Sequence, residues 1–103
     1  MYGNPQRRLD SDVQDLRREG GRWLKTLRED AGLSQRQLAS LVGADYYTFI
    51  SQLETGRGRI PPDRYADWAE ALKLDARTFV TNLLRYYDPV TYAILFDDAH
   101  AAS

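Results

Sequence analysis

Helix-capping side chains and glycines divide the middle of this chain into segments too short to be stable as isolated helices. Ser34 is followed three residues later by Gln37, the capping-box pattern that begins a helix, and Gly43 can end that helix. A second short segment, about 46–55, ends before Gly56. Isolated helices shorter than about 12 residues are marginal in water, so tertiary packing must hold both segments in place. The sequence therefore predicts an all-α fold built from packed short helices.

An earlier segment carries apolar side chains at helical spacing and ends at Gly32, which suits a C-terminal cap. Its apolar positions are Leu16, Trp23, Leu24, Leu27 and Ala31. Gly20 and Gly21 leave two interpretations open: they mark the true start of this helix, or they lie inside it at a cost of about 1 kcal/mol each. Each of the two short segments is expected to place its apolar side chains on one inward face: Leu38, Ala39, Leu41 and Val42 in the first, and Phe49, Ile50 and Leu53 in the second.

Proline and aspartate predict where the later helices begin. Pro62 can occupy the first position of a fourth helix, and Asp75 can cap a fifth. The side chains expected to face inward from these two helices are Tyr65, Trp68, Ala69 and Leu72, then Phe79, Val80, Leu83 and Leu84. Asp88 and Pro89 repeat the start signal, but the run at 92–96 is too short to distinguish a sixth helix from a strand. We favour the helix.

Length and composition limit the class of protein. The 103 residues are enough for one domain with its own core. The chain has no Cys, which excludes disulfides and sulfur-ligated metal sites, and its longest apolar run is far shorter than the roughly 20 residues of a membrane helix. The polar N-terminus does not resemble a signal peptide, so we expect a cytoplasmic protein that does not enter a membrane. We divide the chain into a partly flexible N-terminal arm (1–14), a domain of packed helices (15–87) and a C-terminal extension with a frayed tail (88–103).

Charge and the titratable residues exclude further classes. The net charge of −1 argues against a protein that coats nucleic acid through bulk charge. His100 lies beside Asp97 and Asp98, but the sequence shows no convergent ligands around them, so we expect no metal and no cofactor. No nucleophile and base can be paired, and GRGR follows a helix rather than a strand, unlike a nucleotide-binding loop. We therefore expect that the chain is not an enzyme.

Three stretches carry a family pattern: RWLKTLREDAGLSQRQLASLVG, TFISQLETGRGRIP and YADWAEALKL. Gln35 opens the second helix with Ala39 four residues later, and ISQLETGR closes the third. Over residues 22–74 the chain thus resembles the lambda-repressor-like (Xre/Cro) helix-turn-helix domains. The resemblance implies a compact five-helix domain that binds double-stranded DNA: a transcriptional regulator of a prokaryote or phage, expected to be a homodimeric repressor that reads a palindromic operator in the major groove.

The sequence departs from the family pattern in the turn before the recognition helix. Counted from Gln35, the family's two core positions fall on Phe49 and polar Gln52, one residue before the better core pair Ile50 and Leu53. We therefore infer one extra residue in the turn. With ISQLETG as the anchor, the resemblance places the base-contacting positions at Tyr47, Thr48, Ser51 and Gln52. The alternative for Tyr46 and Tyr47 is that one or both pack against the second helix as core.

Phosphate contacts and one internal ion pair complete the predicted site. The candidates for contact with the DNA backbone are Gln35, Arg36, Tyr46, Arg57 and Arg59. The alternative for the two arginines of the Gly56–Ile60 loop is a solvated basic turn. The resemblance also implies a structural salt bridge between Arg28 and Glu54. Arg7, Arg8, Arg17 and Arg18 form either a basic arm or a solvated face.

The C-terminal extension is rich in aromatic and aliphatic side chains. These side chains must be buried, either against the core of the same chain or against a second copy. We favour a homodimer, and the candidate dimerisation residues are Tyr87, Tyr92, Ile94, Leu95 and Phe96.

A protein-interaction module on the same scaffold, such as an antitoxin or adaptor, is the competing hypothesis. The pI near 5.7 and the lack of Arg or Asn in the recognition helix favour it, whereas Gln35, Gln52, Arg57 and Arg59 favour DNA. We expect no small-molecule ligand, because this length leaves no separate sensor domain.

Overall fold

The structure, a computed structural model, describes residues 5–44 and 46–96. These residues form helices and no strand, so the all-α prediction is confirmed. The elements are α1 (Pro5–Asp30), α2 (Gln35–Leu41), α3 (Thr48–Glu54), the 3₁₀ turn η1 (Pro62–Arg64), α4 (Tyr65–Ala71), α5 (Ala76–Tyr87) and α6 (Pro89–Phe96). The predictions for the start of the arm (1–4), for Asp45, and for the tail with Asp97, Asp98 and His100 lie outside the described residues.

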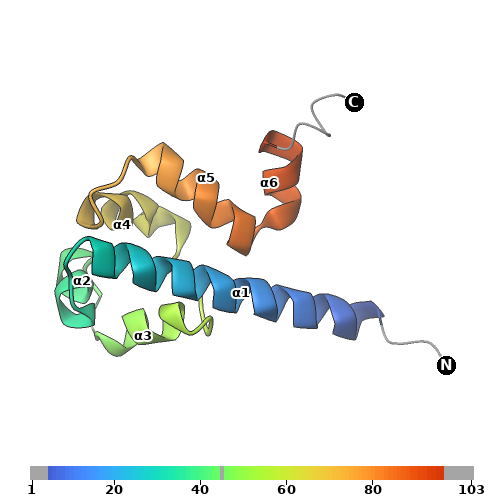
Figure 1. Ribbon diagram of the computed structural model, residues 1–103, viewed down its shortest axis with the longest axis horizontal. Coiled ribbons are helices and arrows are strands. Elements are labelled where there is room, and N and C mark those ends of the chain that lie inside the picture. The colour runs from blue at the N-terminus through green and yellow to red at the C-terminus, as the bar shows by residue number, and fades with distance from the viewer. Residues whose placement is uncertain (1–4, 45, 97–103) are drawn as a thin grey trace.

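Helix α1 runs through the middle of the molecule, with α3 on one side and α4 and α5 on the other (Figure 1). This helix begins at Pro5, so residues 5–14 of the expected arm are helical. Its N-terminal part extends beyond the other helices. None of the helices in the described part of the chain is long and apolar enough to cross a membrane.

Gly20 and Gly21 lie inside α1 and not at its start, and both are buried. A Cβ on Gly20 would lie 2.8 Å from Cβ of Tyr86 on α5. A Cβ on Gly21 would lie 2.8 Å from the carbonyl oxygen of Leu53 and would clash with the carbonyl of Glu54. The two glycines therefore allow α3 and α5 to approach α1 on two different sides, and this close packing offsets their poor helix propensity.

The core lies where α1 to α5 meet, and its buried apolar side chains include Leu24, Leu38, Ile50, Leu53, Ile60, Trp68, Phe79 and Leu83. Trp23 is half-buried, and its ring stacks on Phe79 with the ring centroids 5.6 Å apart. The prediction that Leu41 faces inward is wrong, because its side chain is exposed. Leu41 lies about 100° around the helix from buried Val42 and therefore points away from the core.

The predicted caps position the later helices. Pro62 begins η1, which continues into α4. The Asp75 carboxylate accepts a hydrogen bond from the backbone N–H of Thr78 (2.9 Å) and caps α5. Asp88 accepts bonds from the backbone N–H and the hydroxyl of Thr91 at the start of the last helix. Within the C-terminal extension, Pro89–Phe96 thus forms a sixth helix, as the cap-then-proline signal predicts.

Candidate nucleic-acid interface

Helices α2 and α3 form a pair joined by a turn. The hydroxyl of Ser34 accepts a hydrogen bond from the backbone N–H of Gln37 (3.0 Å), and the Gln37 side-chain oxygen accepts one from the backbone N–H of Ser34 (2.8 Å). This is the predicted capping box. After α2, Gly43 adopts a φ of +72°, a conformation that glycine enters at no steric cost. The chain can therefore turn sharply into α3.

The packing of α3 supports the interpretation of one extra residue in the turn. Ile50 and Leu53 are fully buried, whereas Gln52 is exposed and Phe49 is half-buried. With the usual family offsets, Phe49 and Gln52 would occupy the two core positions instead. The observed burial fixes the rotation of α3 and, with it, the face that α3 shows to solvent.

That outward face carries the four residues predicted to contact bases. Tyr47, Thr48 and Gln52 are exposed, and Ser51 is half-buried. Tyr47 is 43% exposed and Tyr46 is 74% exposed, so neither tyrosine is a core residue in this structure. The side chain of Tyr47 makes no capping hydrogen bond at the start of α3.

Arg36 and Tyr47 form a contact that the sequence did not indicate. The guanidinium carbon of Arg36 lies 4.5 Å from the centre of the Tyr47 ring, a cation–π geometry. Both side chains are exposed, one at the start of α2 and the other just before α3. The contact brings a predicted phosphate-binding cation next to a predicted base-contacting ring.

A buried ion pair holds the other end of α3 against α1. Nε of Arg28 donates to Oε2 of Glu54 (2.6 Å), and a second guanidinium nitrogen donates to Oε1 (3.2 Å). A third bond runs from the same guanidinium to the carbonyl oxygen of Leu33 (2.8 Å). The hydrogen bonds to Glu54 raise the pKa of Arg28 above its ordinary value. The bidentate geometry fixes the position of α3 along α1.

Gln35 joins the same network. Its side-chain amide donates a hydrogen bond to Oε1 of Glu54 (3.1 Å), and the side chain is half-buried. From the sequence, Gln35 is expected to contact the DNA backbone, and that expectation stays a prediction. In the structure its amide contacts Glu54, the last residue of α3.

The two arginines after α3 have different surroundings. The backbone N–H of Arg57 donates to the carbonyl oxygen of Gln52 (2.8 Å), so Arg57 directly follows the last turn of α3, with its side chain exposed. Arg59 is also exposed, but its guanidinium carbon lies 5.0 Å from the centre of the Tyr87 ring at the end of α5. Arg57 therefore lies closer to the predicted base-contacting face, whereas Arg59 is directed towards α5.

The comparison with protein families agrees with this arrangement. Residues 21–88 match the family model described as a helix-turn-helix domain. The chain belongs to the helix-turn-helix domain family. No curated protein matches it. The helix-turn-helix resemblance predicted from the sequence is confirmed, and the matched range leaves two helical parts outside it: residues 5–20 of α1 and the whole of α6.

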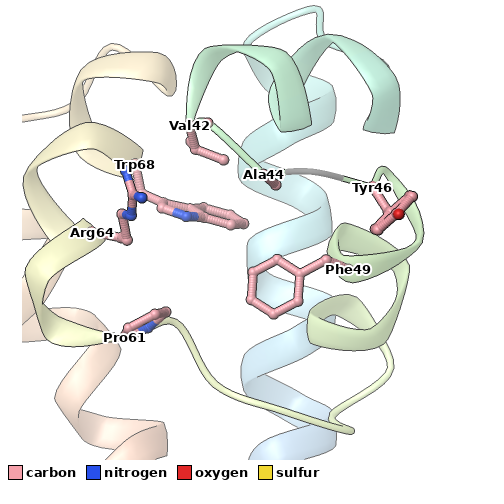
Figure 2. A pocket seen from close by; sticks show the side chains of 8 residues that line it. Val42, Ala44, Tyr46, Phe49, Pro61, Arg64 and Trp68 are labelled. Atoms are coloured by element: carbon pink, nitrogen blue, oxygen red, sulfur yellow. The ribbon is translucent and has the colours of Figure 1, made fainter.

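A hollow of about 310 Å³ lies beside the start of α3 in the helix-turn-helix domain. Figure 2 shows Trp68 and Arg64 on one wall and Phe49 and Tyr46 on the other. Val42, Gly43, Ala44 and Pro61 complete the lining. The hollow has no local signal in the sequence, because its walls come from α3, the turn before it and the η1–α4 segment.

The five predicted dimerisation residues fall into two groups. Ile94, Leu95 and Phe96 are exposed on α6, and half-buried Tyr92 packs its ring near Phe96 with the centroids 5.3 Å apart. Tyr87 differs, because it is buried within the chain and its hydroxyl accepts a hydrogen bond from the backbone N–H of Ile60 (3.1 Å). This burial raises the pKa of Tyr87 above its ordinary value. The proposal for Tyr87 is therefore corrected: its ring belongs to the intrachain core.

Proposed function

We propose that the chain is an Xre/Cro-type, sequence-specific DNA-binding regulator that inserts α3 into the major groove and acts as a homodimeric repressor in the cytoplasm. One observation carries the proposal. The exposed face of α3 has Arg36 beside Tyr47, the residue that directly precedes the helix, and Arg57 beside its last turn. A helix in the major groove has a phosphate backbone on each side, and cations at both ends of α3 suit that environment.

The side chains between these arginines can distinguish bases. The amide of Gln52 can pair with the edge of adenine, and the ring of Tyr47 can pack on the methyl group of thymine. Thr48 and Ser51 can donate to or accept from several base edges. The arginines fix the register of α3 but carry no sequence information themselves. A dimer would bind two half-sites about 34 Å apart, and its occupancy of a promoter would exclude polymerase.

Selection from a random-sequence DNA pool, followed by titration of the selected and unselected duplexes across salt, tests the proposal. We expect a palindromic consensus that binds at least about a thousandfold more tightly than random DNA. Tyr47→Ala and Gln52→Ala should lower the ratio of specific to random affinity. Arg57→Ala should weaken both kinds of binding and reduce the salt slope by about one.

Arg77→Ala provides the matched control, because Arg77 is an exposed arginine on α5, across α1 from α3. Its removal should leave both affinities and the salt slope unchanged. Equal losses on all sequences for Tyr47→Ala, Gln52→Ala and Arg57→Ala would contradict the assignment of base and phosphate contacts.

The hollow beside α3 favours a second candidate, a protein-interaction module. Its walls carry Phe49 and Trp68, and the neighbouring Tyr46 is largely exposed, a surface suited to an apolar side chain of a partner. Charge reversal at Arg57 and Arg59 distinguishes the candidates: it should abolish retention on DNA if α3 binds the groove. If the hollow is the functional site, the selection should yield no enriched sequence and the charge reversal should leave partner binding intact.

A further inference from the structure

Helix α6 is apolar on nearly all sides, with Thr91 bonded to Asp88 as its one short polar side chain, yet much of that apolar surface faces solvent. Its sequence, PVTYAILF, contains no charged residue, and the helix packs against α5. Ile94 and Leu95 are each 61% exposed, and Val90 is 70% exposed. A helix that is apolar on all sides is usually buried on all sides. The contact with α5 therefore leaves part of the apolar surface of α6 exposed, and we expect a second partner to bury it.

A second apolar surface lies on the N-terminal part of α1. Val13 and Leu16 precede Gly20 and Trp23 at spacings of three and four residues, so all four share one face of the helix. Gly20 and Trp23 use this face to contact Tyr86 on α5. The same face continues past α5, where Val13 is 47% exposed. Figure 1 shows this part of α1 and α6 at the same end of the molecule, away from α2.

We propose that these two surfaces form one interface with a second copy of the chain, in which α6 of each copy packs on the Val13–Leu16 face of α1 in the other. The inference rests on the homodimer of the proposed function and adds to it the N-terminal part of α1. Both surfaces lie in parts of the chain that extend beyond the matched domain at residues 21–88.

The size of the surfaces explains why both are needed. An eight-residue helix is about 12 Å long, which is too short to bury by itself the roughly 800 Å² that each partner contributes to a stable interface. The exposed turns of α1 supply additional length. Two-fold symmetry uses each α6–α1 contact twice, which doubles the buried area without a further surface.

Exposed charges of opposite sign lie beside the two surfaces, whereas Arg17 on the same part of α1 is half-buried over the Tyr87 ring. Asp12 and Glu19 are exposed on α1 next to the Val13–Leu16 face. Arg85 is exposed at the end of α5, and its guanidinium carbon lies 5.3 Å from the centre of the Tyr92 ring on α6. When α6 of one copy packs on α1 of the other, Arg85 approaches the acidic edge of α1. This complementarity favours a second copy as the occupant over a partner of unrelated charge.

Sedimentation of the full chain and of single substitutions tests the inference. We expect a dimer for the unmodified chain, and Val13→Asp and Ile94→Asp should each raise the dimer dissociation constant more than about tenfold. Both positions are exposed, so helical content measured by circular dichroism should not change. Leu41→Asp is the matched control, since it places the same charge at an exposed leucine on α2 and should leave the dimer intact. A monomeric unmodified chain, or a Val13→Asp chain that dimerises normally, would overturn the inference.

A charge exchange gives a second, independent readout. Arg85→Asp should weaken the dimer by placing like charges together, and the double variant Asp12→Arg/Arg85→Asp should recover most of the loss. Absence of any recovery would contradict the α6–α1 pairing.

DNA selection distinguishes this inference from the proposed function. If the chain forms a dimer that Val13→Asp weakens, but selects no DNA sequence, sequence-specific DNA binding is overturned and the proposed interface is supported. A chain that selects DNA but sediments as a monomer with and without its site would overturn the interface.

Discussion

At the scale of the residue, Gly21 shows how one missing side chain sets the distance between two helices. It faces the backbone of Leu53 and Glu54 so closely that a methyl group has no space. Gly21→Ala should improve helix propensity by about 1 kcal/mol, yet we expect a net loss of roughly 1–3 kcal/mol of unfolding free energy because α3 must shift. Urea unfolding measures the difference. Lys25→Ala, at an exposed position of the same helix, should cost little, and a stabilised Gly21→Ala variant would contradict the close packing.

A second prediction at this scale concerns the ion pair between Arg28 and Glu54. Both residues are buried, at 8% and 7% exposure, so Arg28→Met leaves a buried carboxylate without its partner. We expect a loss of about 3–5 kcal/mol of unfolding free energy, most of it recovered in Arg28→Met/Glu54→Leu. Arg18→Met, which breaks the exposed Arg18–Asp15 pair, should cost less than about 1 kcal/mol. Similar losses for Arg28→Met and Arg18→Met would show that burial does not determine the effect.

At the scale of the element, two helix caps make stability depend on pH. Hydrogen bonds from Thr78 lower the pKa of Asp75, and hydrogen bonds from Thr91 lower the pKa of Asp88. A carboxylate whose pKa falls on folding stabilises the fold fully above its unfolded pKa of about 3.9, and this contribution disappears as pH falls through the folded value.

Asparagine can cap a helix without titrating in this range. The melting temperature of the unmodified chain should therefore fall between about pH 5 and pH 2.5, and Asp75→Asn/Asp88→Asn should reduce that fall. Melting curves recorded by circular dichroism at both pH values measure the effect. An unchanged pH dependence in the double variant would assign the fall to other carboxylates.

The elements were more predictable from the sequence than their contacts. Caps and apolar spacing are local signals, so the starts of α2, α5 and α6 and the burial of Ile50 and Leu53 could be inferred from the sequence. Whether Gly20 and Gly21 interrupt α1 could not, because the answer depends on Tyr86 and on the end of α3, both far away in the chain. Leu41 was misplaced for a related reason, since the angular width of the buried face of a short helix is set by its neighbours.

The same limit applies to the candidate site. Sequence spacing indicated which residues of α3 face outward, but the contact of Arg36 with Tyr47 requires the relative position of two helices. The bond from Gln35 to Glu54 and the burial of Tyr87 against Ile60 are also contacts between segments that are distant in sequence. The sequence of a single chain carries no local pattern that predicts these contacts, because they form only when the helices pack together.

At the scale of the whole molecule, α1 connects α3 to the Val13–Leu16 face. Gly21 and Arg28 hold α3 against one part of this helix, and the Val13–Leu16 face lies on another, with uninterrupted helix between them. A pair of copies joined through that face would therefore have no hinge between the joint and the two recognition helices. The separation of the two recognition helices and their relative rotation about the DNA axis would be fixed before the protein binds DNA. A site longer by one base pair turns its second half by about 35° and would no longer match both recognition helices at once.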